Sequence, residues 1–153
     1  MIEPLVVEFE VRGSPARAFA LWTERTALWW PADHTISGDT EDIVFEPFAG
    51  GRIFERSGAD CHDWGRVQVW DPPGSLGFSW HLFFTPEEAT DVAITFSAIE
   101  AGTRIRITQT GWDRLGQAGP PRRERTGSVW TGLLSRLGAA IDALDGTGNE
   151  PPG

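Results

Sequence analysis

Residues 65–80 read GRVQVWDPPGSLGFSW and predict two β-strands joined by a tight turn. In the first strand Val67 and Val69 share one face, and in the second Phe78 and Trp80 share one face. This alternation with a period of two is typical of a strand that buries one side. The sequence DPPG between the two halves is a strong turn signal. We therefore expect an antiparallel hairpin that presents an apolar face to an interior.

Further strands are expected on both sides of this hairpin. The seven strand patterns lie at residues 5–11, 43–46, 52–56, 65–70, 76–84, 91–99 and 103–109. Ile94 and Phe96 share the inward face of the sixth pattern, while Ile107 shares that of the seventh with Gln109. A buried, unpaired amide costs about 1–3 kcal/mol, so either another core group or a ligand must satisfy Gln109.

Helices are predicted at two places. Ser14 and Pro15 are suited to cap and start a short helix over residues 15–22, and a second short helix covers residues 26–30. Near the C-terminus an amphipathic stripe at spacings of three and four residues predicts a long helix. Its members are Trp130, Leu133, Leu134, Leu137, Ile141 and Leu144. Glycines at 127, 132 and 138 interrupt this helix and favour a close approach to the sheet, or a helix that can shift.

These elements predict an α+β fold. A seven-stranded antiparallel sheet with one long amphipathic helix across it must curve around that helix to cover its apolar face. Two short helices cannot fill all the space beneath such a sheet. We therefore expect a cavity between the concave sheet and the C-terminal helix.

Composition excludes several classes of function. The 153 residues carry a formal net charge of −9, which disfavours nucleic acid and anionic membranes as partners. All 13 basic residues are arginines, so Schiff-base chemistry and a P-loop lysine are excluded. Neither a membrane span nor a signal peptide is apparent, and Cys61 is the single cysteine, so we expect a cytoplasmic protein.

Four patches of sequence resemble a known family, the START-like helix-grip superfamily (SRPBCC), and within it the bacterial single-domain homologues of the activator of heat-shock protein 90 ATPase. The patches are PARAFALW with LWWP at residues 15–31, FAGGRIF at 48–54, GRVQVWDPP with LGFSW at 65–80, and GTRIRITQTG at 102–111 with WTGLLSRL at 130–137. Val129 departs from the family pattern, which usually has glycine there, and Phe48 and Ala49 stand where a basic residue is frequent.

The resemblance implies a helix-grip (START/Bet v-like) domain over residues 1–145, followed by a flexible tail at 146–153. It implies a pocket but no fixed catalytic set. We expect binding of a small hydrophobic or amphipathic ligand without a cofactor, a metal or catalytic residues. Two alternatives stay open: an enzyme of the polyketide cyclase/dehydratase kind, and a protein-interaction module like the chaperone activators. A homodimer also stays open.

The expected ligand-binding residues are the inward-facing members of the strands and of the long helix. They are Trp30, Val67, Val69, Phe78, Trp80, Ile94, Phe96, Ile107, Gln109, Trp130, Leu134 and Leu137. Each aromatic among them is either pocket wall or core filling, since most buried aromatics are packing.

Several polar groups carry weaker signals. Arg52 and Arg66 lie on strands and either hold a carboxylate at the cavity mouth or face solvent. Cys61-His62-Asp63 lacks the spacing of a tetrahedral metal site and is interpreted as a loop. Asp33, His34 and Glu46 could act together as an acid/base pair, but nothing in their spacing along the sequence brings Glu46 close to the other two. A short basic run, RRER at 122–125, is interpreted as a solvated helix start.

Overall fold

The computed structural model describes residues 2–38, 40–82 and 84–147. Within these residues the strands are β1 Leu5–Val11, β2 Asp42–Phe45, β3 Arg52–Ser57, β4 Asp60–Asp71, β5 Ser75–Trp80, β6 Thr90–Ile99 and β7 Gly102–Thr110. The α-helices are α1 Pro15–Glu24, α2 Thr26–Trp29 and α3 Gly119–Thr147. Short 3-10 turns lie at η1 Ala32–His34, η2 Pro86–Glu88 and η3 Trp112–Ala118. The expected tail begins inside α3, and its last six residues, 148–153, lie outside the described residues.

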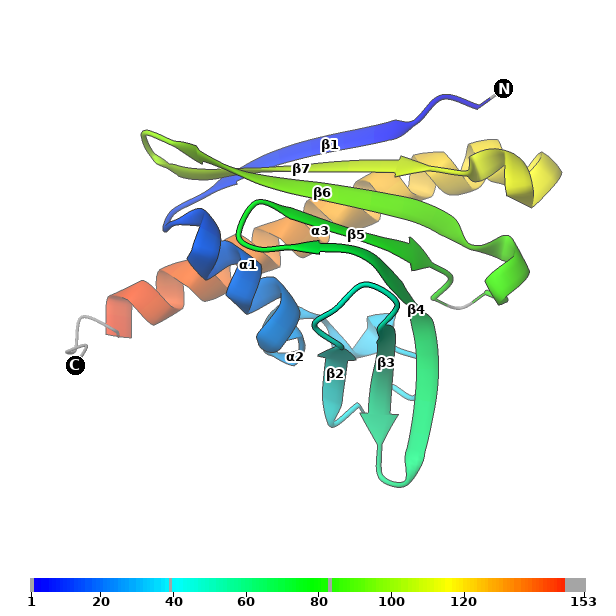
Figure 1. Ribbon diagram of the computed structural model, residues 1–153, viewed down its shortest axis with the longest axis horizontal. Helices are drawn as coiled ribbons and strands as arrows, with labels where there is room; N and C mark the ends of the chain where they lie inside the picture. Colours follow the sequence, from blue (N-terminus) through cyan, green and yellow to red (C-terminus); the bar gives the residue numbers. More distant parts are fainter. Residues whose placement is uncertain (1, 39, 83, 148–153) are drawn as a thin grey trace.

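The strands form one antiparallel sheet in the order β1-β7-β6-β5-β4-β3-β2 (Figure 1). The predicted seven-stranded antiparallel sheet is confirmed, and the six strands β2 to β7 form the predicted meander. The first strand pairs with the last, so β1 and β2 form the two edges. Residues 12–41, which include α1 and α2, therefore cross from one edge of the sheet to the other.

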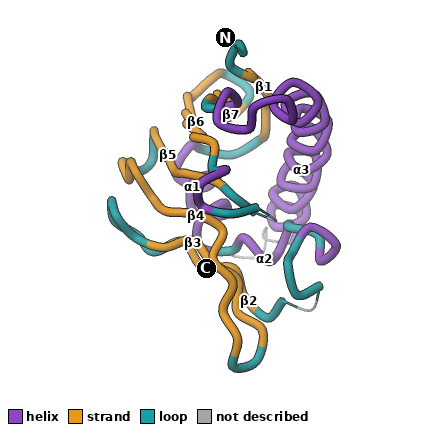
Figure 2. The backbone as a smooth tube through the Cα atoms, turned by 90° about the vertical axis from the view of Figure 1, so that its right-hand side faces the viewer, coloured by secondary structure: helices purple, strands orange, loops and turns teal. Residues whose placement is uncertain are grey.

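The long helix α3 lies along one face of the sheet, and the strands curve around it (Figure 2). Helices α1 and α2 contact both α3 and strand β2, so they occupy the end of the space between sheet and helix. None of the described helices is long and apolar enough to cross a membrane.

The hairpin at residues 65–80 forms as predicted, with Val67 opposite Phe78 and Trp70 opposite Leu76. One prediction about it is wrong. The pairing register shifts between Val67 and Val69, which places Val69 on the outer surface with 47% of its area exposed. An extra residue in one strand of a pair turns the following side chains to the opposite face. Val69 therefore does not face the interior.

The prediction that Cys61, His62 and Asp63 form a loop is also wrong. All three lie in β4, which begins at Asp60 and pairs with β3. This end of β2, β3 and β4 projects away from α3 (Figure 1). Both of its faces carry polar residues for that reason, and the alternation that marks a half-buried strand is missing.

Aromatic side chains fill a large part of the interior, alongside aliphatic ones. Trp22, Trp29 and Phe78 each have at most 1% of their surface exposed. Helices α1 and α2 place Phe19, Trp22 and Trp29 beneath the sheet. Six tryptophan rings are linked by centroid distances between 5.0 and 6.3 Å. They are Trp22, Trp29, Trp30, Trp64, Trp80 and Trp130.

The glycines of α3 differ in their surroundings. A Cβ at Gly138 would lie 3.2 Å from Phe9 Cε2 of β1, and one at Gly127 would lie 3.3 Å from Leu5 Cδ1. No atom lies within 4 Å of the corresponding position at Gly132. The expected close approach to the sheet therefore applies to Gly127 and Gly138 but not to Gly132.

We predict that Gly132→Ala raises the free energy of unfolding by about 1 kcal/mol, because alanine favours the helix and meets no neighbour. Gly138→Ala, the matched substitution, should gain less or lose stability because it must displace Phe9. Urea denaturation measures both differences. An equal gain at the two positions would contradict this account of the helix–sheet contact.

Candidate functional site

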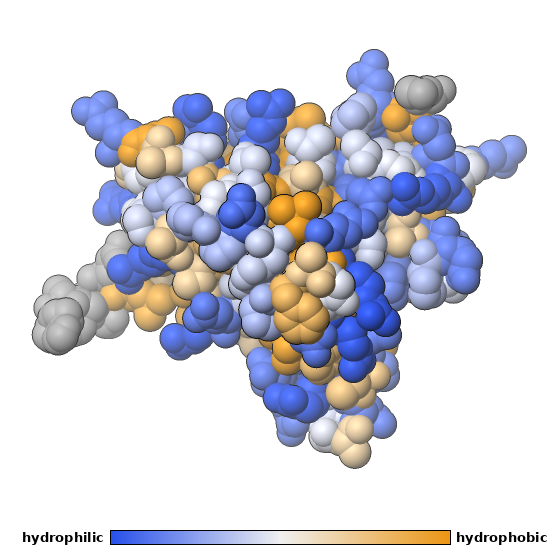
Figure 3. All heavy atoms as spheres, in the orientation of Figure 1, coloured by the Kyte–Doolittle hydropathy of each residue, from blue (hydrophilic) through white to orange (hydrophobic). Residues whose placement is uncertain are grey.

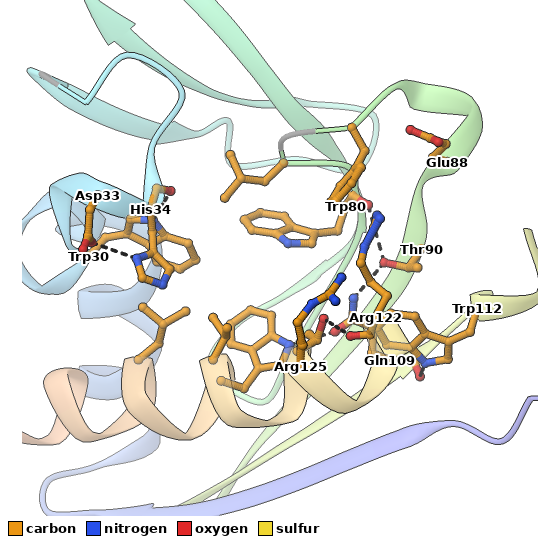
Figure 4. A pocket seen from close by; sticks show the side chains of 16 residues that line it. Trp30, Asp33, His34, Trp80, Glu88, Thr90, Gln109, Trp112, Arg122 and Arg125 are labelled. Carbon is orange, nitrogen blue, oxygen red and sulfur yellow. Dashed lines mark hydrogen bonds and ion pairs between the residues drawn. The ribbon is translucent and has the colours of Figure 1, made fainter. Parts of the chain in front are cut away.

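A cavity of about 350 Å³ lies between the first half of α3, the ends of β5, β6 and β7, and the α2–η1 segment. Four of its lining residues are tryptophans: Trp30, Trp80, Trp112 and Trp130. Figure 4 shows the Trp80 indole extending into this space above α3. The volume is at the lower end of the range for small-molecule sites.

Three of the four indoles are held in place by hydrogen bonds. Trp30 Nε1 donates to the His34 carbonyl oxygen at 3.0 Å, and Trp112 Nε1 donates to the Gln109 carbonyl oxygen at 3.0 Å. Trp130 Nε1 donates to Gln109 Oε1 at 2.7 Å. The Trp80 ring is placed by its aromatic neighbours, 5.8 Å from Trp30 and 6.2 Å from Trp130. The apolar walls are therefore largely pre-formed.

Gln109 is satisfied by the protein itself. Its Nε2 donates to Thr90 Oγ1 at 2.7 Å, while its Oε1 accepts from Trp130. The side chain is 2% exposed and lines the cavity. Of the two alternatives left open by the sequence, satisfaction by other core groups applies. Gln109 thus fixes one wall by joining β7, β6 and α3.

The expected binding residues separate into three groups. Trp30, Trp80, Gln109 and Trp130 line the cavity. A second group is buried in the packed part of the interior, outside the lining of this cavity: Val67, Phe78, Ile94, Phe96, Ile107, Leu134 and Leu137. Val69 is exposed on the outer surface. The second group is enclosed because α1 and α2 fill the interior beneath it, which strand periodicity does not reveal.

Sequence reasoning missed the charged residues that α3 and η2 contribute to the lining. Arg122 and Arg125 reach the cavity from the start of α3, and Glu88 lies on the opposite side (Figure 4). The available signal was the helical period, since Arg122, Thr126 and Val129 extend the stripe of Trp130 and Leu133 toward the N-terminus. The arginines predicted for this role lie elsewhere: neither Arg52 nor Arg66 lines the cavity.

Asp33 and His34 line the cavity at the end of η1 (Figure 4). His34 Nδ1 lies 2.9 Å from Asp33 Oδ1, and this hydrogen bond lowers the pKa of the exposed Asp33 carboxyl. Glu46 is not part of the group, because its carboxylate accepts from the Arg52 backbone N–H at 2.7 Å. His81 does not line the cavity, and its buried Nδ1 has no hydrogen-bond partner among the described residues.

A buried carboxylate supports the loop behind Trp30. Glu55 of β3 is 0% exposed and accepts from Thr40 Oγ1 at 2.6 Å, from the backbone N–H groups of Ile36 at 2.6 Å and Ser37 at 3.0 Å, and from Trp64 Nε1 at 2.8 Å. Burial raises its pKa, but these four donors outweigh that effect and lower it to about 2. Trp64 in turn packs against Trp30, with ring centroids 5.3 Å apart. Glu55 thus helps to hold one cavity wall.

No group of three or more histidine, cysteine, aspartate or glutamate side chains that could hold a metal ion occurs among the described residues. The chemistry available at the cavity therefore comes from indole rings, two guanidinium groups and the Asp33–His34 pair.

Comparisons with known proteins agree with the fold. The family model described as "Activator of Hsp90 ATPase homolog 1-like protein" matches residues 12–142. Protein MLL2253 from Mesorhizobium loti is 18% identical with a TM-score of 0.70, over 92% of this chain and 98% of that one. The Aha1 dimer from Colwellia psychrerythraea is 17% identical with a TM-score of 0.67, over 92% and 96%.

A third similar structure is an enzyme. The anthrahydroquino-gamma-pyrone synthase Txn09, complexed with SUM, is 25% identical with a TM-score of 0.61, over 91% of this chain and 97% of that one. No curated protein matches the chain by sequence.

We predict that Glu55→Gln lowers the free energy of unfolding by roughly 3 kcal/mol at neutral pH, the value of a pKa held at about 2 instead of 4.5. Because the folded-state pKa is depressed, this stabilisation is complete above pH 4.5 and disappears as the pH falls toward 2. The difference from wild type should therefore narrow over that interval. Glu100→Gln, at an exposed turn glutamate, is the control. A difference in free energy of unfolding between wild type and Glu55→Gln that stays constant from pH 7 to about pH 2 would contradict the role of the Glu55 charge.

Proposed function

We propose that this chain, which belongs to the family of Activator of Hsp90 ATPase homolog 1-like proteins, binds a small amphipathic molecule in the cavity lined by Trp80 and Trp130. One observation carries the proposal: a cavity of about 350 Å³ stays open among four tryptophans although the rest of the interior is packed. The hydrophobic effect favours occupation of such a space by about 25 cal/mol per Å² of apolar surface buried.

The cavity has access to solvent. Phe84 and Val129 line it and are each 39% exposed, so its lining continues onto the surface. Elsewhere hydrophilic side chains predominate on the face shown in Figure 3, with hydrophobic atoms in smaller areas between them. The other exposed large apolar side chains come from separate elements: Val6, Leu28, Ile36, Phe48 and Val69. The apolar surface at the cavity mouth thus supports a ligand site better than an extended docking face.

The Colwellia relative is a dimer, and a homodimer stays a prediction for this chain.

The neutral dye N-phenyl-1-naphthylamine, whose fluorescence rises in apolar surroundings, tests this proposal. We predict that it binds wild-type protein at one site and that Val129→Trp weakens binding about tenfold or more, because a bulky ring takes up space at the mouth. Val69→Trp makes the same substitution at a valine outside the cavity and should leave binding unchanged. Equal weakening by both variants, or no binding to wild type, would refute the cavity as the site.

A second candidate is an enzyme that removes a proton next to a carbonyl group, as a polyketide cyclase does. The Asp33–His34 pair at the cavity favours it, as does the likeness to the synthase Txn09. When His34 Nδ1 carries the proton, it donates to Asp33 Oδ1, and Nε2 keeps a lone pair that can accept a proton. A flat ketone lying among the indoles would present its α-carbon to this base.

Deuterium exchange at the α-carbon of 1-tetralone in D₂O measures such proton removal by NMR. For an enzyme, the wild-type protein accelerates exchange, His34→Gln abolishes the acceleration without changing dye binding, and His62→Gln on β4 has no effect. Exchange at the uncatalysed rate with wild type would leave ligand binding without chemistry as the function.

A further inference from the structure

Two arginine side chains extend from α3 into the cavity described above. Arg122 and Arg125 both line it, and Figure 4 shows their guanidinium groups directed toward the space beside Trp80 and Thr90. They are one turn apart at the start of the helix, where the sequence pattern indicated only a solvated helix start. Two charged side chains therefore line a cavity whose walls also include four indole rings.

Neither arginine is neutralised by a carboxylate. Other arginines of the described residues form ion pairs with Asp or Glu, among them Arg12, Arg52, Arg56, Arg104, Arg106 and Arg114. Within the same part of the chain Arg122 and Arg125 form no such pair. Arg122 and Arg125 thus bring two cations to a cavity whose lining also carries the carboxylates of Asp33 and Glu88, in a protein with a formal net charge of −9.

The acidic side chains that share the cavity are engaged elsewhere. The Glu88 carboxylate accepts from the Thr85 backbone N–H at 3.1 Å and caps η2. The Asp33 carboxylate accepts from His34. Both therefore moderate the positive charge of the arginines from a distance, and neither occupies their hydrogen-bond donors.

Arg122 is held in a partly dehydrated place. Its guanidinium carbon lies 3.0 Å from the centroid of the Phe84 ring, and the residue is half-buried. Burial lowers the pKa of Arg122, Glu88 raises it and Arg125 lowers it, yet a guanidinium stays charged at neutral pH. A partly buried guanidinium that forms no ion pair attracts an anion more strongly than a fully solvated arginine does.

The helix adds to this attraction. Helix α3 begins at Gly119, so Arg122 and Arg125 lie in its first two turns, close to the positive end of the helix dipole. Cations are unfavourable there, and an anion would be stabilised both by the guanidinium groups and by the helix.

We propose that Arg122, assisted by Arg125, binds the acidic group of an amphipathic ligand, a carboxylate or sulfonate joined to a flat apolar body that lies against Trp80 and Trp130. This inference rests on the proposed function and specifies its class of ligand. The planar guanidinium offers two parallel N–H donors that match the two oxygens of such a group. The four indoles and Leu133 supply the apolar surface for the body.

Two dyes that differ by one acidic group test the proposal. The first, 1-anilinonaphthalene-8-sulfonate, is anionic, and the second, N-phenyl-1-naphthylamine, has the same rings without the sulfonate. Arg122→Gln should weaken binding of the anionic dye about 10- to 100-fold, the range for losing a charged hydrogen bond, and change that of the neutral dye less than about threefold. Arg122→Lys keeps the charge but loses the planar pair of N–H donors. Its affinity for the anionic dye should therefore lie between those of wild type and Arg122→Gln.

Arg66→Gln is the matched control, because it removes the same charge from an exposed strand residue outside the cavity. It should leave both dyes unaffected, and far-UV circular dichroism should show all variants folded. If Arg122→Gln changes the two affinities equally, or changes neither, the anion site is overturned while the cavity stands. If neither dye binds the wild-type protein, the proposed function fails and this inference fails with it.

Discussion

A single buried amide ties the long helix to the sheet at the inner end of the cavity. The Gln109 side chain of β7 donates to Thr90 of β6 and accepts from the Trp130 indole of α3, while the backbone carbonyl oxygen of Gln109 accepts from Trp112. Without this amide the buried indole N–H of Trp130 would lose its hydrogen-bond acceptor. This network fixes the positions of two indoles and keeps them from collapsing into the space beside Trp80. The shape of the cavity therefore depends on this hydrogen-bond network.

Around this anchor the molecule divides into a packed half and an open half. Toward α1 and α2 the concave sheet is filled by Phe19, Trp22 and Trp29. Toward η1 and the start of α3 the described residues leave a cavity open, and three of the four indoles in its walls donate their N–H groups to the protein. Glu55 extends the same principle outward, since its four hydrogen bonds hold the segment behind Trp30 and the Trp64 ring beside it. Hydrogen bonds made by polar groups thus hold the apolar walls of the cavity in place.

The sequence predicts the fold well because most strands bury one face with a period of two. The exceptions are part of β4 and β3, in which Ile53, Phe54 and Glu55 are all buried. The sequence predicts the cavity only in part. Gln109 is found because an amide interrupts the apolar row of Ile105 and Ile107, and Trp30, Trp80 and Trp130 are found as inward aromatics. The prediction fails for Val69 because of a β-bulge, which the alternation of apolar and polar residues does not indicate. Asp33 and His34 are recognised as a possible acid/base pair but not placed at the cavity, and Arg122 is interpreted as solvated. These residues lie in a 3-10 turn and at a helix start, where tertiary packing alone decides which residues meet.

The most direct test of the account is a crystal structure of the protein with bound 1-anilinonaphthalene-8-sulfonate. The account predicts the aromatic rings of the dye against Trp80 and Trp130, with sulfonate oxygens about 3 Å from the Arg122 guanidinium nitrogens. Dye density confined to the outer surface, with the indoles closed over an empty interior, would contradict the claim that this fold keeps a ligand site open.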